Sequence, residues 1–128
     1  MMDIDNFKKV NDTYGHKIGD RVLEALASVS LTTLRSIDII GRIGGEEFAI
    51  LLPNTDIERA EEVAERLRAN LAEYQLTINA NSIVKFTVSL GVTSYNSNED
   101  ISLDSLLHQA DQALYQAKNE GRNRIVTY

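Results

Sequence analysis

The sequence predicts an α+β fold with a βαββαβ core, an extra β-hairpin and a mostly antiparallel sheet. Three observations lead to this prediction. Apolar residues recur at helical spacing in four segments, apolar and polar residues alternate around two turn sequences, and a short apolar segment stands near each end of the chain. In chain order these segments give a strand, two helices, a hairpin, a helix, a hairpin, a helix and a strand. This pattern alone places the helices on one face of the sheet.

The composition is typical of a single soluble globular domain. The chain has 128 residues, of which 43% are hydrophobic and 25% charged, so it is long enough to bury a core. It contains no apolar run of membrane-spanning length and no visible signal peptide. Without cysteines, a metal could bind only to oxygen ligands or to the two histidines. The net charge of −6 argues against general binding of nucleic acid, so no polymeric nucleic acid is expected as a partner.

Residues 42–53 predict a β-hairpin with a tight, acidic turn. Gly44 and Gly45 supply backbone freedom at the turn, and Glu46 and Glu47 follow between two apolar, β-branched stretches. Adjacent glutamates at a hairpin tip repel each other unless a cation lies nearby, so the turn favours a metal site. An ordinary acidic surface turn explains the same residues equally well.

The chain starts with what reads as the end of a strand, followed by two helices. Asp5 is expected to cap a helix over residues 7–14, which Gly15 ends. A second helix is expected over about 20–34, where apolar residues share one face.

The remaining elements follow from the same periodicities. They are a helix that opens at the capping box 55–58, a second hairpin over 76–78 and 84–93 around the turn 79–81, a helix over about 103–120 that Gly121 closes, and a strand over 124–128.

The first strand and the hairpin are expected to be neighbours in this layout, which brings Asp3 and Glu46 together across more than 40 residues of sequence. The backbone N–H groups of Phe7 and Lys8 open the first helix, and such a helix start suits a phosphate group, while Asp3 suits a divalent cation. An acidic pair beside a phosphate-ready helix indicates metal-assisted phosphoryl or nucleotidyl transfer. The simpler alternative is that Asp5 only caps the helix and Asp3 is only exposed.

Cationic residues elsewhere have equally simple explanations when taken alone. Arg35 and Asp38 are explained as a surface ion pair that contributes little stability. Lys118 and Arg122 stand near the end of the last helix, where cations interact favourably with the helix dipole.

Taken together, the motifs make the chain recognisable. It resembles the GGDEF family, the diguanylate cyclases of bacteria, in its GGEEF variant and over essentially the whole chain. The matching segments are Asp3-Ile4-Asp5-Asn6-Phe7-Lys8, Asn11-Asp12-Thr13-Tyr14-Gly15-His16, Gly19-Asp20, Gly44-Gly45-Glu46-Glu47-Phe48, Val88-Ser89-Leu90-Gly91-Val92, Ala110-Asp111, Tyr115-Gln116-Ala117-Lys118 and Gly121-Arg122-Asn123. Each segment is weak alone, but their combination in this order is specific.

The resemblance implies a nucleotidyl-cyclase-like fold, with helices packed on the faces of the sheet, and an enzymatic activity. Members of the family condense two GTP molecules into cyclic di-GMP and release pyrophosphate. The implied cofactor is Mg²⁺ or Mn²⁺. The implied partners are GTP, cyclic di-GMP, a second copy of the domain in a transient homodimer, and an upstream sensor or receiver domain.

The resemblance also implies roles for individual residues. Asp3, the Ile4 carbonyl and Glu46 would hold the metal, and Glu46 and Glu47 would be catalytic. The residues that would bind substrate are Phe7, Lys8, Asn11, His16, Asp20, Gly44, Gly45, Lys118 and Arg122. Arg35, Asp38 and Arg66 would form a product-inhibition site.

The chain departs from the family pattern at its start, where a preceding helix with an Asp-x-Leu-Thr-Gly-type motif and the front of the first strand are absent. We therefore expect residues 1–128 to be a single catalytic domain cut from a longer sensor protein, cytoplasmic in location even where that protein is membrane-anchored. Two alternatives are a degenerate module that binds GTP or cyclic di-GMP without catalysis, and a plain dimerisation domain.

Overall fold

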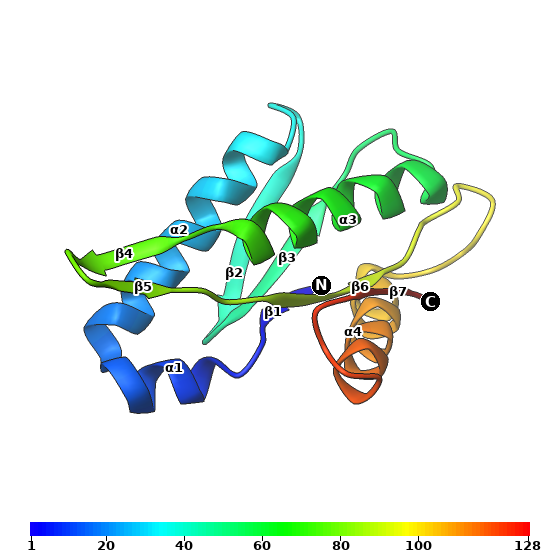
Figure 1. Ribbon diagram of the computed structural model, residues 1–128. Helices are drawn as coiled ribbons and strands as arrows, with labels where there is room; N and C mark the ends of the chain where they lie inside the picture. The colour runs from blue at the N-terminus through cyan, green and yellow to red at the C-terminus, as the bar shows by residue number, and fades with distance from the viewer.

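A computed structural model describes residues 1–128 and contains four helices and seven strands (Figure 1). The elements in chain order are β1 (Met2–Ile4), α1 (Phe7–Tyr14), α2 (His16–Thr33), β2 (Ile39–Gly44), β3 (Glu47–Leu51), α3 (Ile57–Glu73), β4 (Leu76–Asn79), β5 (Ser82–Val84), β6 (Val88–Val92), α4 (Leu103–Asn119) and β7 (Ile125–Thr127). None of the helices combines the length and the apolar character that crossing a membrane requires.

Five strands form the main sheet in the order β2-β3-β1-β6-β7, and only the β6–β7 pair is parallel. The predicted α+β fold with a mostly antiparallel sheet is therefore confirmed. β4 and β5 form the extra hairpin, a separate two-stranded sheet that projects beyond the main sheet beside α2 (Figure 1). The short strand β1 occupies the centre of the main sheet and pairs with β3 on one side and with β6 on the other.

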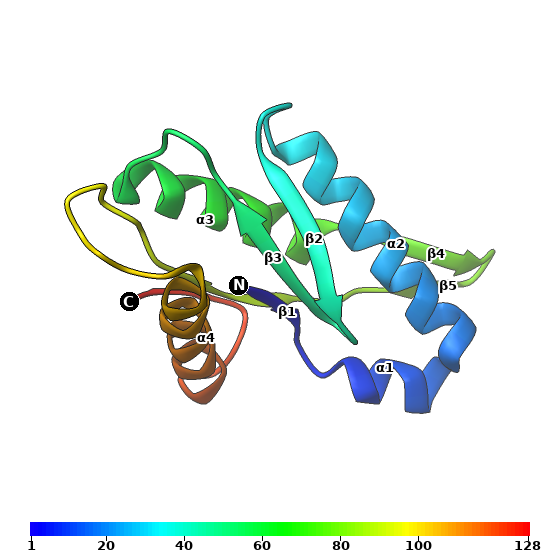
Figure 2. The ribbon, with the colours of Figure 1, turned by 180° about the vertical axis from the view of Figure 1, so that it is seen from behind.

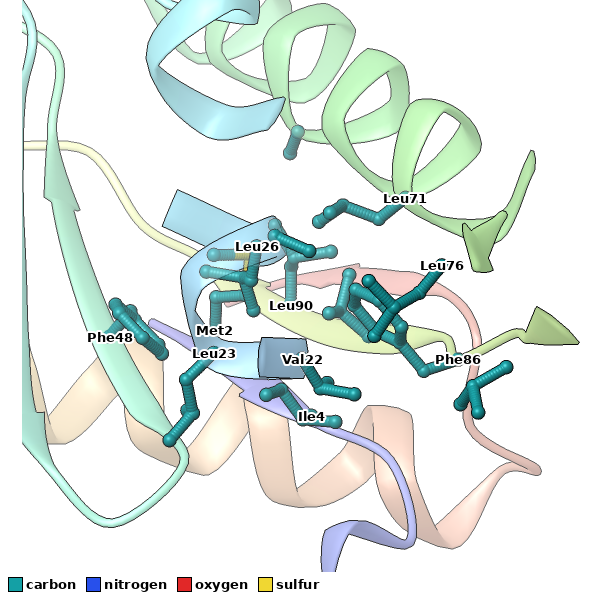
Figure 3. Packing of buried hydrophobic residues seen from close by; sticks show 14 residues of the cluster. Met2, Ile4, Val22, Leu23, Leu26, Phe48, Leu71, Leu76, Phe86 and Leu90 are labelled. Atoms are coloured by element: carbon teal, nitrogen blue, oxygen red, sulfur yellow. The ribbon is translucent and has the colours of Figure 1, made fainter. Parts of the chain in front are cut away.

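The apolar core lies between the main sheet and helices α2 and α3 (Figure 3). Met2 and Ile4 of β1 are almost completely buried in it, and no residue of α4 belongs to this cluster. Helix α4 instead packs on the opposite face of β6, where a Cβ atom on Gly91 would overlap the backbone of α4. The expectation from periodicity alone, that all helices share one face, is thus wrong, and helices cover both faces.

Two predicted elements have different bounds in the structure. The second helix begins at His16 rather than at residue 20, because Gly15, with φ of 88°, turns the chain directly from α1 into α2. The expected strand over 84–93 is divided into β5 and β6. β5 pairs with β4, whereas β6 must pair with β1 and β7, so the chain leaves one sheet and enters the other at residues 85–87.

The caps of two helices also differ from the prediction. Asn6, in a left-handed conformation with φ of 54°, precedes α1 and provides no side-chain cap, and Asp5 is buried elsewhere. At α3 the cap is Asp56, which accepts a hydrogen bond from Arg59 N. Thr55, the first residue of the predicted capping box, instead donates its hydroxyl to the Pro53 carbonyl.

Candidate active site

The sheet brings the end of β1 against the acidic hairpin. Asp3 lies opposite Glu47 in the antiparallel β1–β3 register, and the backbone N–H of Ile4 donates to the Glu46 carbonyl at 3.3 Å. Gly45 adopts φ of 48° in the turn and accepts a hydrogen bond from Arg42 Nε at 2.8 Å, which ties the tip to its own strand. The predicted neighbourhood of the first strand and the hairpin is confirmed.

Strand alternation decides which way Asp3 points. Because successive side chains of a strand point to opposite faces, burial of Met2 and Ile4 in the core turns Asp3 toward the face that α4 covers. There Asp3 Oδ2 pairs with Lys118 Nζ at 2.9 Å. Lys118 belongs to the last turn of α4, so this ion pair joins the C-terminal end of that helix to the centre of the sheet.

The surroundings of Asp3 do not fully compensate its charge. The residue is 3% exposed, and burial raises the pKa of its carboxyl group above the ordinary value. Lys118 opposes this increase, whereas Glu46 and Glu47 add to it through repulsion. A cation placed between these carboxylates would relieve both the desolvation and the repulsion.

Asp3 and Glu46 fit a divalent metal ion only if most of its ligands come from outside the chain. No group of three carboxylate or imidazole side chains is assembled for a metal anywhere in the chain. Mg²⁺ does not require such a group, since it is usually bound by one or two carboxylates, substrate phosphates and water. Asp3, Glu46 and the carbonyl of Ile4 supply a donor set of that kind.

Donors for phosphate surround the same end of the sheet. The backbone N–H groups of Phe7 and Lys8 donate to no other backbone group, because they belong to the open first turn of α1. The hairpin tip, the β1–α1 connection and the C-terminal end of α4 lie along one edge of the sheet in both views (Figures 1 and 2). Lys8 and Arg122 are exposed there.

A second set of predicted residues meets where α1 contacts α2. The Oδ1 atom of Asn11 is buried without a hydrogen-bond partner, and a Cβ atom on Gly19 would overlap it. Gly19 is therefore needed for α2 to approach Asn11. Asp20 follows Gly19 and is exposed, and His16 is exposed at the first position of α2 rather than in the loop that the sequence predicted.

Arg35 and Asp38 form an ion pair at the turn between α2 and β2. Asp38 accepts hydrogen bonds from the Arg35 backbone N–H at 2.8 Å and from Nη2 at 2.8 Å, with both oxygens also 3.2 Å from Nε. Arg35 Nη2 donates in addition to Thr55 Oγ1 and the Pro53 carbonyl. Arg66 lies nearby on α3, where its Nη2 donates to the Thr33 carbonyl at 3.4 Å.

Sequence reasoning missed the setting of Asp5. This residue is 6% exposed and accepts three hydrogen bonds instead of capping α1. One signal was available, since Asp3 and Asp5 are two residues apart at the end of a strand and so project to the same face.

Comparison with known proteins identifies the family. The profile described as "Diguanylate cyclase, GGDEF domain" matches residues 1–124. The chain belongs to the GGDEF family. Two relatives are "Diguanylate cyclase A" of Treponema denticola, 45% identical over 125 residues, and "Diguanylate cyclase DgcM" of Escherichia coli K12, 44% identical over 126 residues. Each alignment covers 98% of this chain but only 33% and 29% of the two relatives, so the chain spans about a third of their length.

Solved GGDEF structures superimpose closely on the fold. The diguanylate cyclase SiaD of Pseudomonas aeruginosa, solved in complex with its activator SiaC, gives a TM-score of 0.93 at 38% identity, covering 99% of this chain and 48% of SiaD. The active GGEEF domain of a Vibrio cholerae diguanylate cyclase gives 0.89 at 40% identity, with coverage of 99% and 79%. The GGDEF domain of DgcB from Caulobacter crescentus, in complex with c-di-GMP, gives 0.90 at 35% identity, with coverage of 98% and 74%.

Proposed function

We propose that this GGDEF domain is a diguanylate cyclase that condenses two GTP into 3′,5′-cyclic di-GMP and two pyrophosphates. The observation that carries the proposal is the buried, incompletely compensated Asp3 beside the acidic hairpin. A purely structural domain gains nothing from three carboxylates at one end of a sheet, because burial and mutual repulsion both oppose the arrangement.

In this proposal Asp3, Glu46 and the Ile4 carbonyl hold Mg²⁺ or Mn²⁺, which would neutralise the triphosphate and the departing pyrophosphate. Glu46 would accept the single proton of the ribose 3′-OH as that oxygen attacks the α-phosphate of the partner GTP and pyrophosphate leaves, and Glu47 would lie near the same hydroxyl or a second metal. The glycines of the turn, Gly44 and Gly45, let the backbone of the hairpin approach the nucleotide closely.

The triphosphate is held at the start of α1 and the end of α4. The free N–H groups of Phe7 and Lys8 receive the terminal phosphates, and the helix dipole favours their charge. Lys118 and Arg122 add positive charge. Lys118 Nζ contacts Asp3 Oδ2 at 2.9 Å, so this ammonium group lies at the same end of the sheet.

Guanine is recognised between α1 and α2 by Asn11 and Asp20, with His16 in reach of the nucleotide. The N1–H and N2–H₂ groups of guanine are adjacent donors that one carboxylate can accept together, and adenine lacks that pair. Asn11 packs against Gly19, the residue before Asp20, and its side-chain oxygen has no hydrogen-bond partner within the chain.

Catalysis requires two copies of the domain. Each copy holds one GTP, so two must face each other across a two-fold axis, bridged by the substrates themselves. We propose a transient homodimer brought together by other parts of a longer polypeptide, such as a sensor or receiver domain. The site would work on the cytoplasmic side of a cell, where GTP is found, and product bound at Arg35 and Asp38 of one copy and Arg66 of another would hold the active sites apart.

Product analysis tests the proposal. The chain, alone and within the longer polypeptide that carries it, is incubated with GTP and Mg²⁺, and the products are separated by chromatography. Cyclic di-GMP and pyrophosphate are expected. Glu46→Gln should reduce turnover at least about 10-fold with the fold intact, because an amide is a poor Mg²⁺ ligand and no base. Glu73→Gln, an exposed change at the end of α3, is the control.

Calorimetry with GTP and with cyclic di-GMP, beside the product assay, distinguishes the alternatives. Binding of GTP or cyclic di-GMP without product in either form of the protein would indicate a degenerate, non-catalytic module. Binding of neither nucleotide would leave a dimerisation domain.

Base selection is the second test. We expect GTP to be preferred over ATP by at least about 100-fold, because adenine would leave the guanine-reading acceptors unpaired. Gly19→Ala should reduce this preference, since its methyl group would displace Asn11. Gly41→Ala is the matched control, because a methyl group there meets nothing. Equal efficiencies for the two nucleotides in the wild-type protein would refute the guanine assignment.

A further inference from the structure

Asp5 is a buried carboxylate that the proposed chemistry does not use. It lies one residue beyond β1 and two residues from Asp3, on the face of the sheet that α4 covers. Its Oδ1 accepts from Ser89 Oγ at 2.6 Å, and its Oδ2 accepts from Thr87 Oγ1 at 2.7 Å and from the backbone N–H of Asn123 at 2.9 Å. These three short hydrogen bonds give both side-chain oxygens of Asp5 a partner within the chain.

The bond to Asn123 crosses 118 residues of sequence and reaches an unusual turn. Between α4 and β7, Gly121, Arg122 and Asn123 have φ of 125°, 66° and 47°. Two consecutive residues with side chains in the left-handed region are unfavourable by themselves, so the surrounding structure must impose this conformation.

Other hydrogen bonds hold the turn to α4, to its own segment and to α3. Gly121 N and Arg122 N donate to the Lys118 and Ala117 carbonyls at 3.4 and 3.0 Å, and Arg124 Nε donates to the Arg122 carbonyl at 3.1 Å. The side-chain oxygen of Asn123 accepts from Arg68 Nη1 on α3. Asp5 supplies the bond that joins the turn to the end of β1, and hence to Asp3 and the hairpin.

We infer that Asp5 is a positioning residue for the triphosphate, because it fixes the turn from which the Arg122 side chain departs. This inference depends on the proposed function. The Arg122 side chain is exposed and makes no hydrogen bond or ion pair within the chain. Holding its backbone in place before substrate arrives reduces the ordering that binding must supply.

The chemistry of the three donors explains why a hydrogen-bond acceptor stands at this position. The hydroxyls of Thr87 and Ser89 can donate or accept, but a backbone N–H can only donate, so the atom facing Asn123 must be an acceptor. An asparagine at position 5 can keep that bond through its carbonyl oxygen and turn its amino group toward Ser89. Asp5→Asn should therefore retain the hydrogen bond from Asn123 N, and Asp5→Ala should lose it.

Calorimetry with GTP and with GMP, each with Mg²⁺, tests the inference. For Asp5→Ala we expect the Kd for GTP to rise at least about 10-fold while the Kd for GMP changes less than about twofold, because only GTP carries the β- and γ-phosphates. Asp5→Asn should restore most of the GTP affinity. Thr87→Val is the matched control, since it removes one hydrogen bond to Asp5 and leaves the bond to Asn123 intact.

A second readout does not depend on turnover. Amide hydrogen exchange of Asn123 should be slow in the wild type, in Asp5→Asn and in Thr87→Val, and fast in Asp5→Ala. If Asp5→Ala does not fold, Asp5→Ser replaces it, because the shorter side chain cannot reach Asn123 N.

The outcomes separate this inference from the proposed function. Equal losses of GTP and GMP affinity in Asp5→Ala, or slow Asn123 exchange in that variant, would overturn the positioning role while leaving cyclase activity in place. If the Asp5 variants change GTP and GMP affinity as expected but the wild type forms no product, the cyclase proposal is overturned and the positioning role of Asp5 is supported. A wild type that binds neither nucleotide would overturn both.

Discussion

Two ion pairs of similar length hold carboxylates whose pKa values are shifted in opposite directions. Lys118 and Asp3 are 2.9 Å apart, and Arg35 and Asp38 are 2.8 Å apart. The side chains of Asp3 and Asp38 are only 4% and 1% exposed, but Asp3 is a buried residue of the central strand, whereas Asp38 is a half-buried residue of a surface turn. Yet burial raises the pKa of Asp3, whereas hydrogen bonds from Arg35 lower the pKa of Asp38.

Depth of burial is the first reason for the difference, because Asp3 lies in the central strand and Asp38 in a surface turn, and the number of donors adds to it. Asp38 receives a backbone N–H and a guanidinium fork, so its charge is satisfied within a four-residue turn. Asp3 receives one ammonium group and has two further carboxylates nearby. A short ion pair is therefore no proof of a satisfied charge. We infer that the Asp3 end of the sheet favours an added cation, whereas the charge of Asp38 is already compensated by Arg35.

The largest effect that separates the two regions is expected from Asp3→Asn. It should reduce cyclic di-GMP formation by about 100-fold or more, because the site loses a metal ligand. At neutral pH without metal, its thermal midpoint should equal or exceed that of the wild type, since a poorly compensated buried charge is removed and Lys118, with its side chain 30% exposed, can turn to water.

Asp38→Asn provides the contrast. It should keep turnover and lose roughly 1 kcal/mol of stability, because charge-assisted hydrogen bonds are weakened. Chromatography of products and thermal unfolding of both variants measure these effects. An Asp3→Asn variant that is less stable than Asp38→Asn would contradict the contrast.

A smaller effect is expected at the Arg35 turn. Arg35→Ala should abolish detectable binding of cyclic di-GMP, which requires a loss of affinity of at least about 10-fold, because a guanidinium fork is lost from the proposed product site. GTP turnover should persist. Arg59→Ala is the matched control, since Arg59 also forms a 2.8 Å ion pair with a residue three positions away. Calorimetry with cyclic di-GMP measures the affinity. Equal binding by the wild type and Arg35→Ala would reduce the motif to a surface ion pair.

The sequence predicted those parts of the site that depend on strand pairing. Alternation and turn residues placed Asp3 opposite the hairpin, and β1–β3 pairing confirms it. The motifs also predicted the family, which the profile match confirms. The residue roles stay predictions, because neither the fold nor the relatives test them.

Features that depend on packing between distant segments could not be predicted from local sequence patterns. The position of α4 depends on the close approach at Gly91, which periodicity does not encode. Asp5 looked like a helix cap because a carboxylate before an amphipathic helix usually is one. Its actual partners come from β6 and from a turn 118 residues away, and no local pattern reports them.

The smallest predicted effect is a difference in pH dependence between the same two carboxylates. The pKa of Asp3 is raised in the folded state, so its stabilising contribution is present below the ordinary carboxyl pKa of about 3.9 and is lost as the pH rises through the folded-state value. The pKa of Asp38 is lowered, so its contribution is present above about 3.9 and is lost as the pH falls through the folded-state value.

Urea unfolding without metal, from about pH 3 to about pH 7, measures the pH dependence of stability for both variants and the wild type. The stability advantage of Asp3→Asn over the wild type should grow as the pH rises above about 4, and the deficit of Asp38→Asn should shrink as the pH falls below about 4. Two variants with the same pH dependence would mean that Asp3 is as fully compensated as Asp38, and the argument for a cation at Asp3 would fail.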